Sequence, residues 1–508
     1  MTEAPLPTYV DVLVVGGGPA GCALAAEVAS GSSASVLLVE AGPDYGPFAA
    51  GGWPSDLLEA FDLAESHGWG YNSAGTYVDR VVDFSRARVL GGCSAHNGCA
   101  AIWGHRLDYD AWAAAGNRGW ATDDLLPFFA LANERMRVRI PEPRELTPFH
   151  QLMLDSAVKA GIPLVENLND LDEPVGIGPS PANIVDGVRW NAAFAFVDAI
   201  RDGGRLSIAS DLLVDRVLLE GGRAVGVVAI RHNRKHTIRA GTVVLTAGTY
   251  NSPQILLRSG IGDPQELQAA GIRPVLDLPG VGHNLHDHPA VYLTYTGSDR
   301  LKEEMLTWGT SNWLPEEQTI AKLCSSICTE GFDLHIYPES GPYADKRTAW
   351  SFTIPVACMA PRSRGHLTIR TSDPDAAPII NHNYLGDLAG HDRAVLVEGI
   401  GIARRIAAEA NRDGLLGAEL EPGPDLTGIN NLTHWVSNHV HHYFHAAGTC
   451  KMGPSADPTA VVSNRGKVHG LDGLYVADCS IMPQVPRANT NIPAVVAGLR
   501  IGRWLTET

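Results

Sequence analysis

The sequence predicts a fold of the α/β class, α+β when the whole chain is considered, and three observations favour it. An apolar run at Val10–Val15 leads through a glycine cluster into an alanine-rich stretch and a second apolar run, which is the order of a strand–helix–strand unit. Residues 206–247 alternate apolar and polar side chains, as antiparallel strands do. From Leu474 onward, a short apolar run precedes a closing stretch rich in alanine and glycine.

The N-terminal elements follow from hydrophobic patterning. Val10–Val15 has the composition of a short buried strand, Ala20–Ala29 that of a helix packed on a sheet, and Val36–Glu40 that of a second strand. Further along, Pro148–Ala160 has amphipathic spacing and ends at a glycine, which predicts a helix.

The middle of the chain predicts strands and a change of architecture. The turn Glu220–Arg223 lies at the centre of the alternating segment, so a small antiparallel meander is expected there, and Val243–Thr246 then predicts a separate buried strand. Residues 291–440 contain more tryptophan and proline and few glycine turns. We interpret them as mainly a second domain that shapes a pocket.

Composition and charge exclude several classes of protein. The 508 residues, 45% hydrophobic and 19% charged, are typical of a globular chain, and roughly 100–200 residues per domain predicts two to four domains. Because 39 basic and 56 acidic residues leave a net charge of −17, nucleic acid and anionic membranes are disfavoured as partners. Eight scattered cysteines without a CxxC pair, and no N-terminal secretion signal, predict a cytoplasmic protein.

The first glycine cluster predicts a Rossmann-like dinucleotide site. Gly16, Gly18 and Gly21 satisfy the GxGxxG pattern, in which the glycines allow a tight turn, approach to a pyrophosphate and close helix–strand packing. Glu40 closes the second strand, where its carboxylate can bind ribose hydroxyls. An acid at this position favours FAD or NAD over NADP. The alternative is a glycine-rich turn that binds nothing.

Three further segments are specific to one family. They are RVLGGCSAHNG at 88–98, GTYNSPQILLRSGIG at 248–262, and HAAGTCKMG at 445–453, which is followed by GLYVADCSIMP and RANTNIP. Together they resemble the glucose–methanol–choline oxidoreductases, and the resemblance runs from about residue 8 to residue 505. The first segment departs from the usual pattern at Cys93 and His96, and there it is most similar to the choline oxidases.

The resemblance implies bound FAD and a chain divided between two domains. The expected FAD-binding domain is discontinuous (1–150, 191–290 and 443–508), and an antiparallel-sheet substrate domain is expected from 151–190 and 291–442. The implied reaction is oxidation of an alcohol, with hydride passing to flavin N5 and then electrons to oxygen or another acceptor. Monomer and homo-oligomer are both left open.

Two residues match the catalytic positions of the family. His445 matches the histidine that accepts the hydroxyl proton, a role that suits an imidazole at neutral pH. Asn489 matches a second position, histidine or asparagine across the family, where an amide can hold the substrate oxygen. The histidines nearby, at 434, 439, 441 and 442, are expected to pack, face solvent or line the pocket, and no metal site is expected.

His96 yields the sharpest hypothesis about the cofactor. The matching histidine of the choline oxidases is bonded to the flavin 8α carbon, so a covalent link is expected here, with a buried unbonded histidine as the alternative. The resemblance also implies that these residues lie at the cofactor: Gly91, Gly92, Asn97, Val214, Asp478 and Asn491.

The substrate is less constrained. In the choline oxidases an acid in a tryptophan-rich stretch binds the ammonium group, whereas Met305–Trp313 contains no acid, and Glu316 and Glu317 follow out of register. The same region offers neutral hydrogen-bonding groups at Thr307, Thr310, Ser311 and Asn312. We therefore expect a sugar, glycoside or polyol. The alternatives are choline or another amino alcohol, a non-redox lyase on the same fold, and a flavin-binding protein without turnover.

Overall fold

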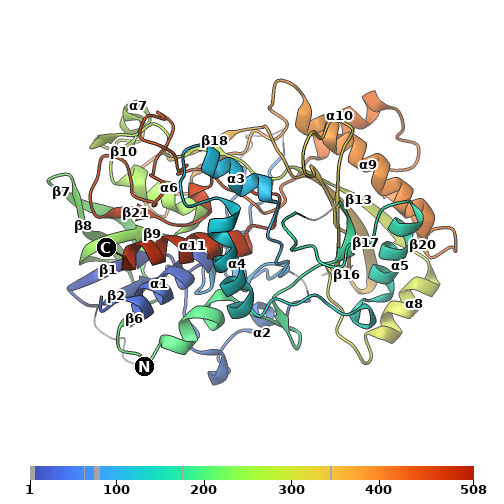
Figure 1. Cartoon of the computed structure of the whole chain (residues 1–508), viewed down its shortest axis with the longest axis horizontal. Coiled ribbons are helices and arrows are strands. Elements are labelled where there is room, and N and C mark those ends of the chain that lie inside the picture. The colour runs from blue at the N-terminus through green and yellow to red at the C-terminus, as the bar shows by residue number, and fades with distance from the viewer. Residues whose placement is uncertain (1–5, 62, 74–79, 173–174, 344–345, 508) are drawn as a thin grey trace.

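Two large sheets lie side by side, each with helices on its outer side (Figure 1). The computed structural model describes residues 6–61, 63–73, 80–172, 175–343 and 346–507. The two sheets belong to different classes, one mixed and one antiparallel, and the predicted fold class is confirmed.

The first sheet is mixed, and its parallel half begins with the predicted strand–helix–strand unit. Its strands, in spatial order, are β6 (Leu206–Ala209), β2 (Val36–Val39), β1 (Tyr9–Val15), β9 (Arg234–Leu245), β8 (Arg223–Arg231) and β7 (Leu213–Glu220), and β21 (Leu474–Val476) also pairs with β9. β1 is buried along its apolar half and pairs in parallel with both β2 and β9. The Val10–Val15 and Val36–Glu40 predictions are therefore confirmed.

One strand replaces two that the sequence predicted. The expected meander is present as β7, β8 and β9, but Val243–Thr246 is not a separate strand. β9 continues through it to Leu245, pairing antiparallel with β8 over its first half and parallel with β1 over its second. The chain does not turn between the halves because the apolar second half can enter the sheet interior without a break.

The two ends of the chain meet in one helical layer. α1 (Pro19–Gly31) and α11 (Asn491–Thr506) lie side by side (Figure 1). Gly498 of α11 permits this approach, because a Cβ there would lie 2.2 Å from the carbonyl oxygen of Ala20. The predicted closing helix thus belongs with the N-terminal strand–helix–strand unit.

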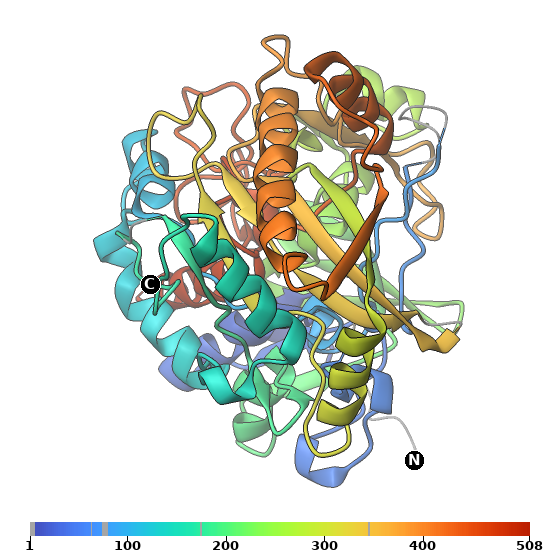
Figure 2. The same ribbon diagram turned by 90° about the vertical axis from the view of Figure 1, so that its right-hand side faces the viewer.

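The second sheet is antiparallel throughout its named pairs. Its strands, in spatial order, are β20 (Leu416–Glu421), β13 (Ala290–Gly297), β17 (Lys346–Cys358), β15 (Leu334–Ile336), β14 (Thr319–Leu323) and β3 (Gly176–Pro179), and β16 (Glu339–Tyr343) pairs with β17. α5 (Pro148–Lys159), α8 (Asp299–Trp308) and α9 (His391–Ala410) stand in front of these strands in Figure 2. α5 confirms the predicted helix at Pro148–Ala160 and packs against α9.

No helix among the described residues is long and apolar enough to cross a membrane. All eight cysteines have free thiols in the structure. Cys324 and Cys328 lie in the loop after β14, and Cys450 and Cys479 are in the segment that precedes α11.

Candidate active site

A cavity of about 780 Å³ is lined by residues of both sheets. It extends from the glycine turn after β1 to the strands β13 and β16 of the second sheet. Among the predicted site residues, those that line it are Gly16, Gly18, Glu40, Gly92, His96, Asn97, Val214, His445, Asp478, Asn489 and Asn491. Gly21 and Gly91 do not line it; Gly21 packs against Gly16 and Thr246, and Gly91 directly precedes Gly92.

The glycine cradle at one end fits a dinucleotide. Gly16 has a φ of +108°, and a Cβ on Gly21 would lie only 1.9 Å from the carbonyl oxygen of Gly16. A Cβ on Gly92 would lie 2.6 Å from the Cα of Gly18, so the second glycine turn packs directly on the first. Gly18 caps α1, whose free N–H groups favour an anion. The space left by these glycines is what a pyrophosphate requires.

Glu40 is fixed at the edge of the cradle. Its two carboxylate oxygens accept hydrogen bonds from the backbone N–H groups of Gly17 and Gly42, each at 2.8 Å. Burial raises its pKa to about 7, against these hydrogen bonds. The carboxylate lines the cavity, where it can accept further hydrogen bonds from ribose hydroxyls.

A pair of histidines occupies the other end of the cavity. His445 Nδ1 lies 2.9 Å from His288 Nδ1, and the two rings are nearly perpendicular. Asp287 Oδ1 accepts hydrogen bonds from the backbone N–H groups of both histidines, each at 2.8 Å, and Tyr384 donates its hydroxyl to Oδ2. The Asp287 carboxylate thereby holds the two histidines together. Because Nδ1 of His445 is engaged, Nε2 is the nitrogen left for substrate.

The environment keeps His445 neutral. Burial lowers its pKa well below the usual range, and the neighbouring rings of His288 and His335 and the positive charge of Arg86 act in the same direction. Burial likewise lowers the pKa of His288 to about 3 and raises that of Asp287 to about 6. A neutral imidazole is the form that can accept a proton from an alcohol.

Three polar atoms of cavity-lining residues lack hydrogen-bond partners among the described residues. They are Asn489 Oδ1, Asn491 Oδ1 and the Tyr443 hydroxyl, which are buried without such a partner. All three side chains line the cavity, and Asn491 uses only its Nδ2, which donates to Asn183 Oδ1 at 3.4 Å. Such groups are costly unless something binds them. They mark this end of the cavity as a place for a polar ligand.

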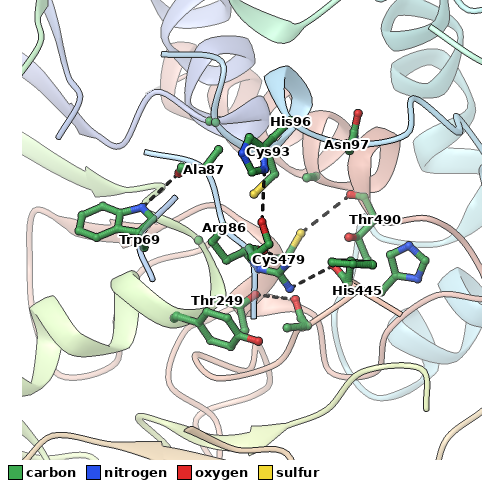
Figure 3. Close-up of a pocket in the computed structure, with 18 of the residues that line it drawn as sticks. Trp69, Arg86, Ala87, Cys93, His96, Asn97, Thr249, His445, Cys479 and Thr490 are labelled. Carbon is green, nitrogen blue, oxygen red and sulfur yellow. Dashed lines mark hydrogen bonds between the residues drawn. The ribbon is translucent and has the colours of Figure 1, made fainter. Parts of the chain in front are cut away.

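His96 lines the cavity with one ring nitrogen engaged (Figure 3). Nε2 lies 2.6 Å from the carbonyl oxygen of Ser66, whereas Nδ1 has only the Ser85 hydroxyl at 3.4 Å. Burial lowers the pKa of the ring. His96 is therefore neutral, and with Nε2 donating its proton to Ser66 the lone pair is on Nδ1.

The carboxylate of Asp478 forms hydrogen bonds with other groups of the protein. Its oxygens accept hydrogen bonds from Gly248 N, Ser252 Oγ and Ser480 N, at 2.9, 2.6 and 2.8 Å. It lines the cavity, but its carboxylate ties α6 (Gly248–Arg258) to the C-terminal segment. Asn97 accepts from Cys99 N and keeps its amide nitrogen for the cavity.

The substrate end differs from the sequence expectation. Thr307, Thr310, Ser311 and Asn312 are exposed at the end of α8, and none of them lines the cavity. Glu316 and Glu317, set aside as out of register, do line it. The chain after α8 turns back under the sheet, because His150 binds the carbonyl oxygen of Glu316 and Ser340 N donates to it as well.

Carboxylates and tyrosines dominate this end. Glu317 accepts a hydrogen bond from the Tyr337 hydroxyl, and a Cβ on Gly98 would lie 2.6 Å from Glu317 Oε2. The acidic and aromatic residues that line the cavity include Tyr292, Glu316, Glu317, Tyr337, Glu339, Glu421, Trp435 and Tyr443. Burial and the neighbouring carboxylates raise the pKa values of the three tyrosines well above their usual range, so the hydroxyls stay neutral.

A dinucleotide cradle continuous with a neutral, buried histidine defines an FAD-dependent oxidoreductase that acts on CH–OH donors. Family models agree over most of the chain: the N-terminal GMC oxidoreductase model matches residues 10–290, and the C-terminal model matches residues 361–498. The chain belongs to the GMC oxidoreductase family, and its cofactor is FAD.

Relatives of known activity span nearly the whole chain. The oxygen-dependent choline dehydrogenase of Brucella anthropi is 32% identical, with 96% of this chain and 94% of the relative covered; that of Rhizobium johnstonii is 30% identical with the same coverage. The crystal structure of pyridoxine 4-oxidase from Mesorbium loti has a TM-score of 0.87 at 27% identity, covering 98% of this chain and 99% of that one. Formate oxidase of Aspergillus oryzae, at 21% identity and a TM-score of 0.85 with 99% of each chain covered, shows the same fold.

Several residues of the site were not found from sequence. Asp287 and His288 lie in the segment GHNLHDH (282–288), and nothing local in the sequence indicates that this segment meets His445. Arg86 precedes the first glycine-rich flavin segment, and Tyr443 precedes His445 by two residues. An arginine two residues before a signature motif is the sequence signal that could have identified Arg86.

Proposed function

We propose that this protein oxidises an alcohol on a small molecule that also carries a positively charged nitrogen. The single observation that carries this is the pairing of Glu317 and Glu339 with Tyr292, Tyr337 and Tyr443 at the substrate end of the cavity. Carboxylates neutralise a cation and aromatic faces attract one, whereas neutral polyols need neither.

The curated relatives support this class of substrate. They act on choline, which has a quaternary ammonium group, and a structural neighbour acts on pyridoxine, which has a ring nitrogen that can be protonated. The prediction of a sugar, glycoside or polyol rested on four residues that lie outside the cavity, so it has lost its support.

The reaction needs a hydride acceptor and a proton acceptor. FAD, when bound, accepts the hydride from the alcohol carbon. His445 Nε2 takes the hydroxyl proton, since its Nδ1 is held by His288 and its ring is neutral. Asn489 lines the cavity, where its side-chain N–H donates a hydrogen bond to the substrate oxygen and holds the hydroxyl toward His445.

The proposal is tested by comparing a cation with its neutral counterpart. Choline and its carbon isostere, in which a tert-butyl group replaces the trimethylammonium, are offered anaerobically, together with pyridoxine, glycerol and glucose, and bleaching of the flavin is followed. We expect choline or pyridoxine to reduce the flavin fastest. Faster reduction by the isostere or by a sugar would contradict the proposal, and no bleaching by any alcohol would favour the lyase.

Replacing Glu317 by glutamine tests the recognition group itself. Glu317→Gln removes the charge but keeps the shape, so we expect kcat/KM for choline to fall by about 10–100-fold, a loss of about 1.4–2.7 kcal/mol, with little change for the neutral isostere. Glu303→Gln, on the exposed face of α8, is the matched control. Equal losses for choline and the isostere would show that Glu317 is structural.

A further inference from the structure

We propose that Arg86 is the residue that stabilises the negative charge FAD acquires on accepting the hydride, and that it thereby raises the reduction potential of the cofactor. Among the described residues no carboxylate lies within ion-pair distance of this arginine, and its position beside His445 puts a fixed positive charge at the reacting end of the cavity.

Arg86 is held in one place by the protein. Its Nη1 donates to the carbonyl oxygen of Ser85 at 2.8 Å and its Nη2 to that of Phe444 at 3.1 Å. The guanidinium carbon lies 5.1 Å from the centre of the Tyr250 ring. In Figure 3 it stands among the cavity side chains between His96 and His445. Since Phe444 directly precedes His445, the arginine is tied to the segment that carries the base.

The electrostatics of Arg86 differ from those of four partly buried arginines that are ion-paired. No carboxylate lies within ion-pair distance of it in the part of the chain that the structure describes. Four others are paired: Arg201 with Asp44 and Asp198, Arg258 with Asp215, Arg404 with Glu419, and Arg487 with Asp108. Two carbonyl oxygens and the Tyr250 ring hold Arg86. The buried carboxylate of Asp287 attracts it from beyond ion-pair distance, so the charge of Arg86 also acts on whatever occupies the cavity.

The charge balance of the reaction gives this cation a role. The alcohol loses a hydride, with its electron pair, to the neutral oxidised flavin, and loses its hydroxyl proton to His445; the flavin then has one negative charge. A fixed positive charge in a site shielded from water stabilises that charge without reorganisation. The same cation helps to keep His445 neutral beforehand, and the negative flavin offsets this effect once the proton has moved.

Sulfite binding measures how the Arg86 charge stabilises an anionic flavin, and it needs no turnover. Sulfite adds to oxidised flavin by forming a sulfur–nitrogen bond, and the adduct is negatively charged, so its dissociation constant reports how well the site tolerates a flavin anion. We expect Arg86→Met to raise the dissociation constant for sulfite at least tenfold, which for a two-electron couple corresponds to a potential lower by about 30 mV. Arg86→Lys, which keeps the charge, should stay closer to the wild type.

Arg88→Met is the matched control. Arg88 is exposed two residues away, stacked on Trp69, and does not line the cavity, so sulfite binding should be unchanged. FAD content is measured first; if Arg86→Met fails to retain FAD, Arg86→Gln is compared with Arg86→Lys. The proposal is overturned if the neutral variant binds sulfite as tightly as the wild type, or if the neutral and lysine variants lose affinity equally.

Discussion

At the scale of single residues, the site depends on one imidazole nitrogen. His288 occupies Nδ1 of His445, and Asp287 fixes the backbone of both. Groups from two segments that are far apart in the sequence thus decide which nitrogen can accept a proton. The same arrangement explains why burial, which lowers the pKa of His445, does not impair its function: the neutral ring is the working form.

Removing the imidazole should remove the chemistry and leave the cofactor. For His445→Ala we expect the rate of anaerobic flavin reduction by choline to fall by about 10²–10⁴-fold, the usual contribution of a general base, with FAD content unchanged. Stopped-flow absorbance measures the rate. His434→Ala, at an exposed histidine of α10 (Ile429–His439), should behave as the wild type. Flavin reduction at the wild-type rate in His445→Ala would show that His445 is not the base.

The pH dependence follows from the direction of the pKa shift. The proton-accepting form of His445 is the neutral one, and lowering its pKa preserves that form to lower pH. We therefore expect kcat/KM for choline to show no loss through His445 between pH 8 and about 6.5, where an ordinary histidine would be half protonated. A half-loss centred at about 6.5 that disappears in His445→Gln would show that the pKa is not lowered.

At the scale of elements, the cradle depends on contact between α1 and the turn before it. Gly21→Ala would place a Cβ 1.9 Å from the Gly16 carbonyl oxygen and 2.7 Å from Thr246 Oγ1. The Gly16 oxygen belongs to the backbone, so the helix must move. We expect a loss of about 1–3 kcal/mol in unfolding free energy and loss of FAD, measured by denaturant titration and by flavin absorbance.

Gly401→Ala provides the comparison within another helix. Gly401 lies inside α9, where an added Cβ meets nothing within 4 Å. Alanine is the better helix former, so this variant should gain about 0.5–1 kcal/mol and keep its FAD. If both glycine variants behaved alike, close packing at Gly21 would not be what holds the cradle.

At the scale of the whole molecule, the FAD cavity joins segments from the start, middle and end of the chain. Gly16, Thr246 and Asn491 all line it, although they belong to β1's turn, the end of β9 and the start of α11. A cofactor held only by this cavity must leave when the chain unfolds, whereas a cofactor bonded to the chain must stay.

We propose that His96 bonds to the flavin, and unfolding tests this. The lone pair on Nδ1 and the neutral ring make His96 a competent nucleophile toward the cofactor. Acid precipitation should leave the yellow colour in the pellet, and His96→Ala should release it into the supernatant while the folded variant still binds FAD. Colour in the supernatant of the wild-type protein would show that the FAD is not covalent.

The dinucleotide site was predictable because its determinants are local. Gly16, Gly18, Gly21 and Glu40 fall within one strand–helix–strand unit, whose geometry follows from hydrophobic patterning and from backbone positions that only glycine fits. The position of His445 was likewise recognisable from the signature segments around it. In both cases short stretches of sequence carry the information.

The tertiary structure alone decided the substrate end and the partner of the base. His288 and His445 are 157 residues apart, and Glu317 reaches the cavity only because the chain after α8 turns under the second sheet. The neutral residues of Met305–Trp313 looked suitable in sequence but lie at the exposed end of α8. Sequence spacing specifies faces within one element, whereas the cavity is formed by packing between elements, so only their arrangement determines which side chains meet there.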